Sequence, residues 1–248
     1  MTPALIGLAG RAGSGKDTVA ALLKDVYGCM PIALADALKR FCVDVFGISP
    51  PLLWGPSEDR NKPFETAIDQ EALVAACVNL RLHGRYTRTL GRTEDSAAFA
   101  RGLFSALHPF LPITTPRRLL QLVGTEWGRA LDLDTWTRQL SCDVEAIRQG
   151  VLYFPQDGAL ESLRTRVTPP PIVVTDVRFE NDAATIVRLG GRVILVDADQ
   201  RVPPLEGIRH SSENARAEVG KYVSAVLDNN GLLDALLPAL KRIVEQTA

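Results

Sequence analysis

The sequence lacks long hydrophobic runs and any strong imbalance of charge. No stretch approaches the about 18 consecutive apolar residues of a membrane-spanning helix. The formal net charge is -1, so the chain as a whole does not attract nucleic acid or an anionic membrane. We expect neither of these as a partner, and any site for a polyanion must therefore be local.

Cysteine is scarce and its positions are scattered. There is no C-x-x-C pair and no histidine partner at a metal-ligand spacing around Cys29, Cys42, Cys77 and Cys142. This arrangement argues against zinc and against a disulfide framework, and it suits a reducing compartment. The apolar N-terminal residues also lack the basic leader of a signal peptide. We therefore expect a soluble protein of the cytoplasm.

The remaining composition is that of an ordinary globular protein. Hydrophobic residues make up 46% of the 248 residues and charged residues 23%, which is enough to bury a sizeable core. The length fits one large α/β domain or a core with a helical insertion.

A glycine-rich turn near the N-terminus is the strongest motif. Apolar residues 5–9 run into G-R-A-G-S-G-K at residues 10–16, and apolar residues at helical spacing follow directly. Gly10, Gly13 and Gly15 can adopt backbone angles that are closed to other residues, so N–H groups can approach a polyphosphate closely. The helix N-terminus adds partial positive charge, and the Lys16 ammonium can reach the β and γ phosphates. The sequence therefore predicts a phosphate-binding loop.

One position departs from the usual form of this loop. The residue after the lysine is commonly Ser or Thr, whose hydroxyl holds Mg²⁺, but here it is Asp17, with Thr18 one place later. Adenylate-kinase-like loops carry a threonine shifted in this way, which favours a small-molecule kinase over a GTPase. Asp17 either binds a magnesium-bound water or stabilises the helix dipole from the first turn.

Strand and helix patterns alternate on both sides of a long helical middle. Strands are predicted over 5–9, 29–35, 172–175, 192–197 and 222–228. Alternation with helices favours an α/β fold of the P-loop NTPase type, in three layers, with a five-stranded parallel sheet. The middle of the chain predicts helices over 64–82, 96–107, 115–131 and 133–149.

This pattern divides the chain into three parts. The core is expected over 1–47 and 172–248, a helical insertion over 48–150, and a surface excursion over 151–171. We expect the insertion to cover the end of the sheet, where open α/β folds place their ligands.

The helix predicted from Thr115 carries a polar stripe. Phosphoryl transfer needs arginines that face the phosphate-binding loop, because they spread positive charge over the transferred group. The stripe holds Arg117, Gln121, Gly124, Thr125 and Gly128. A glycine inside a helix costs about 1 kcal/mol relative to alanine, so either close approach of a ligand or close helix packing must compensate.

Further charged residues lie at the predicted strand ends. Asp176 ends a strand where carboxylates of phosphate-loop proteins often meet the magnesium, and Arg178 follows two residues on. The alternative for this pair is an ordinary strand-end ion pair. Arg201 and Arg209 flank a proline-rich loop that acts either as a lid over the donor phosphates or as solvated surface.

Four stretches of the sequence resemble the phage-type deoxynucleoside monophosphate kinases, which are relatives of adenylate kinase. They follow the family's order from the N-terminus to the C-terminus: G-S-G-K-D-T at 13–18, R-R-L-L-Q through G-T-E at 117–126 with the segment 134–136, T-D-V-R-F-E-N at 175–181, and N-N-G at 229–231. The G-K-D-T and R-R-L-x-Q-x-x-G-T elements are the specific ones.

The resemblance implies transfer of the ATP γ-phosphate to a deoxynucleoside monophosphate, with ATP and Mg²⁺ as cofactors. Lys16, Arg178 and Arg117 would be catalytic, and Asp17 and Thr18 would hold Mg²⁺, in part through water. The donor site would comprise Gly13, Ser14, Gly15, Lys16, Asp17, Thr18, Arg209 and Asn229. The monophosphate site would comprise Asp36, Trp54, Arg117, Gln121, Thr125, Trp136 and Asp176. Family members are similar in forming homodimers, and a phage-encoded member would act in the host cytoplasm.

Two other functions fit the same residues. A kinase like dephospho-coenzyme A kinase would use the Arg117 helix and Trp136 for a different acceptor. A regulatory protein would use the loop only to sense ATP or GTP, although the sequence holds no N-K-x-D motif for guanine.

Overall fold

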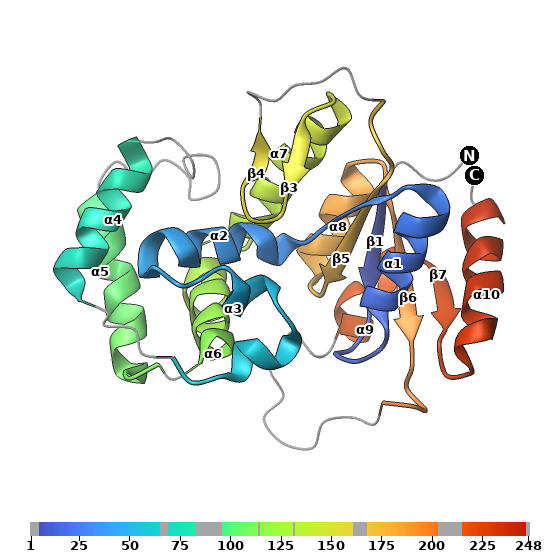
Figure 1. The fold of residues 1–248 in the computed structure, drawn as a ribbon, viewed down its shortest axis with the longest axis horizontal. Coiled ribbons are helices and arrows are strands. Elements are labelled where there is room, and N and C mark those ends of the chain that lie inside the picture. The colour runs from blue at the N-terminus through green and yellow to red at the C-terminus, as the bar shows by residue number, and fades with distance from the viewer. Residues whose placement is uncertain are drawn as a thin grey trace. The chain divides into compact units, whose positions relative to one another are not determined.

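The structure is a computed structural model that describes residues 5–64, 69–82, 96–113, 115–130, 132–160, 168–202 and 215–246 (Figure 1). Two compact units emerge from the packing. Unit 1 comprises Met1–Leu34, Asp143–Leu152 and Ala159–Ala248, and unit 2 comprises Ala35–Cys142 and Tyr153–Gly158.

Unit 1 is built on a parallel sheet of five strands in the order β2-β5-β1-β6-β7. Its strands are β1 (Leu5–Ala9), β2 (Met30–Ile32), β5 (Ile172–Val177), β6 (Arg192–Asp197) and β7 (Val223–Asp228). The three inner strands read as nearly continuous apolar runs because helices bury both faces of the sheet. The predicted α/β fold with a five-stranded parallel sheet is confirmed.

Helices cover both faces of this sheet. Side chains alternate along β1, so Ile6 and Leu8 join a core cluster with residues of two helices on one face, while Gly7 lies against Ile186 of another helix on the opposite face. The first helix ends at Gly28, whose φ of 66° is left-handed, as is common for a glycine that caps the C-terminus of a helix. The elements of unit 1 beside the sheet are α1 (Lys16–Tyr27), α8 (Glu180–Arg188), α9 (Ala215–Val219), a 3-10 turn over Gly220–Tyr222, and α10 (Leu233–Gln246).

Unit 2 is helical around one apolar cluster. Phe41 stacks on Trp127 with ring centroids 5.8 Å apart, and Leu103 and Leu119 are fully buried beside them. Its helices are α2 (Leu34–Phe46), α3 (Pro51–Trp54), α4 (Gln70–Leu82), α5 (Ser96–Leu107), α6 (Pro116–Gln121), a π-helix over Leu122–Arg129, and α7 (Thr135–Arg148), with 3-10 turns over Ser57–Asn61 and His108–Phe110. α2 begins and α7 ends in unit 1. As predicted, the described part of 48–150 holds helices and no strand.

Two segments differ from the sequence prediction. The predicted single helix over 115–131 is α6 followed by the π-helix, so its backbone widens where Gly124 and Gly128 stand. Residues 151–160 hold β3 (Leu152–Phe154) and β4 (Gly158–Leu160), and Tyr153 of β3 is buried, which the expected surface excursion did not anticipate. The division of the chain into functional parts stays a prediction. Within the described residues, no helix is both long and apolar enough to cross a membrane.

Candidate functional site

The glycine-rich loop joins β1 to α1 through three glycines with left-handed or related backbone angles. Gly10, Gly13 and Gly15 have φ values of 146°, 76° and 92°. A β carbon at Gly10 would lie 2.6 Å from the carbonyl oxygen of Val196, so this position excludes any side chain by space as well as by backbone angle. The three glycines therefore adopt the backbone angles expected of them, and phosphate binding by the loop stays a prediction.

Lys16 folds over this loop from the first position of α1. Its Nζ donates to the carbonyl oxygen of Gly10 at 2.8 Å and to that of Arg11 at 2.6 Å. Asp17 and Thr18 follow in the first turn and are exposed, and no side chain caps the N-terminus of the helix. The positive end of the helix dipole and the ammonium group thus lie on the same short segment.

Ser14 and Asn229 meet at the other side of the loop. Asn229 follows β7, is buried, and donates from Nδ2 to the carbonyl oxygen of Ser14 at 2.7 Å. The hydroxyl of Ser14 is itself buried and has no hydrogen-bond partner among the described residues. The resemblance places Asn229 in the donor site, and in the structure its side chain bonds to the loop.

The carboxyl ends of the strands bring the predicted charged residues of unit 1 to one edge of the sheet. Ala9, the last residue of β1, is in register with Val177 of β5 and with Leu195 of β6. Gly10 and Arg178 therefore follow neighbouring strands at the same edge, which is where open α/β sheets bind ligands.

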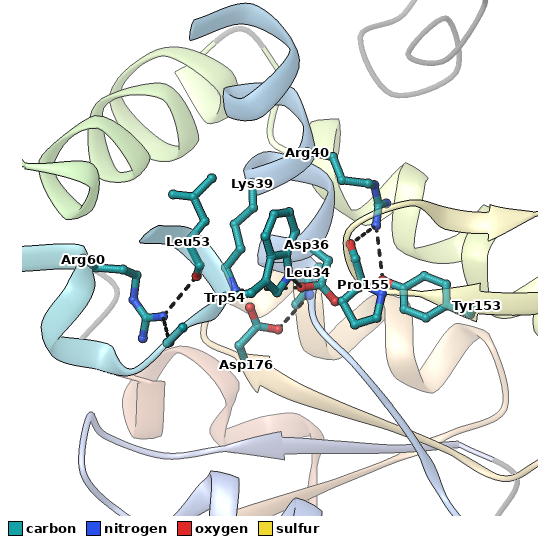
Figure 2. A network of polar contacts seen from close by, with 11 residues as sticks. Leu34, Asp36, Lys39, Arg40, Leu53, Trp54, Arg60, Tyr153, Pro155 and Asp176 are labelled. Carbon is teal, nitrogen blue, oxygen red and sulfur yellow. Dashed lines mark hydrogen bonds and ion pairs between the residues drawn. The ribbon is translucent and has the colours of Figure 1, made fainter. Parts of the chain in front are cut away.

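Arg178 is held by its backbone and not by its side chain. The N–H groups of Arg178 and Phe179 donate to Oδ2 of the buried Asp182 at 3.1 Å and 2.9 Å. The guanidinium is exposed and has no partner within the described part of the chain, so the alternative of a strand-end ion pair does not occur there. Asp176 instead accepts a hydrogen bond at Oδ1 from the backbone N–H of Leu34, at 2.7 Å (Figure 2).

The residues of the predicted lid are only partly described. A β carbon at Gly15 would lie 3.5 Å from Nη2 of Arg201, which places this guanidinium beside the glycine-rich loop. Arg11 pairs with Asp199 at 3.3 Å. Arg209 lies outside the described residues, and its predicted part in donor binding stays a prediction.

In unit 2, Asp36 is the centre of a buried polar network (Figure 2). Its Oδ1 accepts a hydrogen bond from Trp54 Nε1 at 2.9 Å, and its Oδ2 accepts one from the Tyr153 hydroxyl at 3.0 Å. Lys39 Nζ lies 3.8 Å from Oδ1 and 5.3 Å from the centre of the Trp54 ring. A buried carboxylate is stable when it is paired and hydrogen-bonded in this way.

Tyr153 and Arg40 complete the network, and the sequence analysis missed both. Arg40 is 5% exposed and donates from Nη1 to the Tyr153 hydroxyl at 3.3 Å and to the carbonyl oxygen of Pro155 at 2.9 Å. The signal for Arg40 was its helical spacing from Asp36, which puts the two residues on one face of α2. Nothing local marks Tyr153, because it reaches Asp36 from a strand more than a hundred residues later in the chain.

The other predicted acceptor residues lie on α6 and the π-helix. Arg117 is exposed, and its Nε donates to Asn61 Oδ1 at 2.6 Å. Gln121 and Thr125 are half-buried. Their predicted contacts with a monophosphate stay a prediction.

The two helical glycines pack against side chains. A β carbon at Gly124 would lie 2.7 Å from Leu38 Cδ2, and one at Gly128 would lie 2.9 Å from Trp136 Cζ2. Trp136 is buried and donates from Nε1 to the carbonyl oxygen of Gly124 at 2.9 Å. Of the two explanations that the sequence left open for these glycines, close packing is the one observed.

The arrangement of unit 1 is typical of phosphate-binding α/β proteins. The central strand of a parallel sheet leads into a loop that carries glycine and lysine and ends at a helix N-terminus. Among the described residues, no three His, Cys, Asp or Glu side chains come together as a group that could hold a metal ion.

Comparison with known proteins points to a particular kind of phosphate chemistry. No protein-family model matches the chain. Its sequence is 28% identical over 230 residues to a protein of Acanthamoeba polyphaga mimivirus named "Putative deoxynucleotide monophosphate kinase", and the alignment covers 93% of this chain and 90% of the relative. The similarity supports a relationship with nucleotide kinases.

Proposed function

We propose that this protein is a deoxynucleoside monophosphate kinase, which transfers the γ-phosphate of ATP to a deoxynucleoside monophosphate. The observation that carries the proposal is the presence, at one sheet edge, of the Lys16 loop and of Arg178 at the end of the neighbouring strand. The nearly full-length similarity to a protein named for this activity supports it.

The donor ATP binds over the loop and the start of α1. The positive-φ glycines leave room for a polyphosphate close to the backbone, and the uncapped helix N-terminus offers its partial positive charge. Lys16 exchanges its two loop carbonyls for oxygens of the β and γ phosphates. Asp17 and Thr18, exposed in the first turn, fit a role in holding Mg²⁺, in part through water, and the bound ion supplies charge neutralisation.

The acceptor binds to the helical unit. Arg117 is the residue that engages its phosphate, with Gln121 and Thr125 one and two turns further along the same face. Asp36, Trp54 and Trp136 have their polar atoms engaged within unit 2, so in this proposal they shape the acceptor site through packing. Asp176, bonded to the backbone of Leu34, fixes the turn from which α2 begins.

The transfer step needs positioned charge and no strong base. An oxygen of the acceptor phosphate, which is already ionised, forms a bond to the γ-phosphorus while the bond to the oxygen that bridges the β and γ phosphates breaks. That oxygen leaves with ADP. Lys16 and Arg178 stabilise the negative charge of the group in transit.

A coupled assay of ADP formation tests the proposal. With ATP and Mg²⁺, the protein is assayed against dAMP, dGMP, dCMP, dTMP, their ribose counterparts and dephospho-coenzyme A. We expect turnover on one or a few deoxynucleotides. Turnover on dephospho-coenzyme A alone would replace the acceptor, and ATP binding without any turnover would indicate a nucleotide-sensing protein.

Arg178→Ala separates catalysis from binding. A kinase should lose most of its turnover and keep its affinity for ATP. A protein that only senses nucleotides should keep its sensing function. Arg188→Ala is the matched control, because Arg188 is an exposed arginine on α8 whose Nη2 bonds, among the described residues, only to Thr185 Oγ1, at 3.3 Å, within its own helix.

A further inference from the structure

The peptide between Ser14 and Gly15 is held from outside the loop by one side chain. Asn229 Nδ2 donates to the carbonyl oxygen of Ser14 at 2.7 Å, across 215 positions of sequence. Asn229 is 7% exposed, so water does not compete freely for this bond.

Gly15 is the residue that makes room for this contact. A β carbon on Gly15 would collide with Nδ2 of Asn229, and the φ of 92° is itself unfavourable for any other residue. The same glycine leaves the peptide before it free to rotate, because a residue without a β carbon accepts either orientation. A bond that fixes the carbonyl is therefore needed to fix the peptide.

The position of Asn229 is in turn set by the sheet. Its backbone N–H donates to the carbonyl oxygen of Asp197 at 2.7 Å, directly after the pair of Asp197 with Asp228 that ends the β6–β7 ladder. Gly10, at the start of the loop, lies against the carbonyl oxygen of Val196 in the preceding position of β6. The ends of β6 and β7 thus hold the loop at two points.

We propose that Asn229 is a positioning residue of the donor site, which fixes the Ser14–Gly15 peptide for phosphate binding. This peptide is trans, so its N–H points away from its carbonyl and hence away from Asn229. Because Asn229 fixes the Ser14 carbonyl, the N–H of Gly15 points in one direction beside the start of α1. The inference rests on the proposed function, and it assigns the asparagine side chain to the loop.

Asn229→Asp tests this positioning role with almost no change in side-chain shape. A carboxylate oxygen replaces the Nδ2 donor and faces the Ser14 carbonyl, so the hydrogen bond is lost. Binding of ATP with Mg²⁺ and of the accepted monophosphate is measured by calorimetry well below the midpoint of thermal unfolding. We expect ATP affinity to fall about tenfold or more, since a buried acceptor loses its partner, with acceptor affinity within about twofold of wild type. Asn229→Ala removes the donor without adding charge and should show the same split in smaller degree.

Asn230→Ala is the matched control at the neighbouring position. Asn230 bonds to Gln200 and Asp228 and not to the loop, so its loss should leave ATP affinity within about twofold. A purely structural asparagine would lower the unfolding temperature and leave the affinities of the folded protein alone.

The outcomes separate this inference from the proposed function. Unchanged ATP affinity in both Asn229 variants, or equal losses for donor and acceptor, would overturn the positioning role. A wild-type protein that binds ATP without kinase turnover would refute the proposed function, but the effect of Asn229 on ATP affinity could still be measured. A wild-type protein that binds no ATP would overturn both.

Discussion

Glycine serves different physical ends in the two units. In unit 1, Gly13 and Gly15 stand where the backbone turns through positive φ. In unit 2, Gly124 and Gly128 have no positive φ, and what they provide is space for Leu38 and Trp136. The first kind creates backbone that a ligand can approach, and the second creates a core.

Polar side chains divide in the same way. Those around Asp36 in unit 2 are bonded to one another and are mostly buried. In unit 1, by contrast, Arg178, Asp17 and Thr18 are exposed at the edge of the sheet where the loop lies. Substitution of these exposed residues should therefore affect binding and turnover, and substitution within the buried network of unit 2 should affect folding.

The largest effect is expected for Lys16→Ala. In the proposed reaction its ammonium acts on charge that develops during transfer, so we predict a loss of about 100-fold or more in kcat with the unfolding temperature little changed. Lys24→Ala, on the exposed face of the same helix, is the control. Near-normal turnover of Lys16→Ala would remove the loop from the chemistry.

Gly128→Ala should instead destabilise unit 2. The added methyl group would lie 2.8 Å from the carbonyl oxygen of Val123 and 2.9 Å from Trp136 Cζ2, so the buried indole must shift. We predict a loss of about 1–3 kcal/mol in the free energy of unfolding, measured in urea, with ATP affinity kept.

Gly102→Ala provides the opposite case within the same unit. Gly102 lies in the middle of α5, and a β carbon there would meet no atom of the described residues within 4 Å outside its own helix backbone. This substitution should be neutral or stabilise the protein by up to about 1 kcal/mol. If Gly128→Ala and Gly102→Ala destabilised the protein equally, Gly128 would not be needed to make space for its neighbours.

The parts of the fold that local pattern controls could be predicted from the sequence. The five strands of the parallel sheet and the backbone angles of the loop glycines each depend on neighbouring residues, and both were predicted, whereas β3 and β4 were not. The reason for Gly124 could not be found, because it depends on Leu38, which is far away in the chain.

The same limit explains the candidate site. Lys16 and Arg178 follow from motifs at strand ends, but the partners of Asp36 do not, since Trp54 and Tyr153 reach it from two separate segments. Asn229 was singled out by its motif, while the contact of its side chain with Ser14 depends on the tertiary structure.

Arg117→Ala extends the comparison to unit 2, where Arg117 is exposed while most polar side chains around Asp36 are buried. We predict about tenfold weaker binding of the accepted monophosphate, because a charge-assisted contact is lost, with ATP affinity little changed. Arg118→Ala is the control, since that guanidinium pairs with Glu126 at 3.3 Å. Weaker ATP binding with intact monophosphate binding would reverse the assignment of donor and acceptor sites.

The smallest effect concerns the buried thiols, which report on each unit separately. Burial raises the pKa of Cys29 in unit 1 and of Cys77 in unit 2, each to about 11, so at pH 8 a maleimide should label them slowly and only through local opening. ATP stabilises the unit that binds it. Saturating ATP with Mg²⁺ should therefore slow the labelling of Cys29, which lies just after α1, and leave the rate at Cys77 nearly unchanged. Peptide mass spectrometry resolves the two rates. Equal slowing at both thiols would mean that the two units open together, and that the contrast between them does not extend to their dynamics.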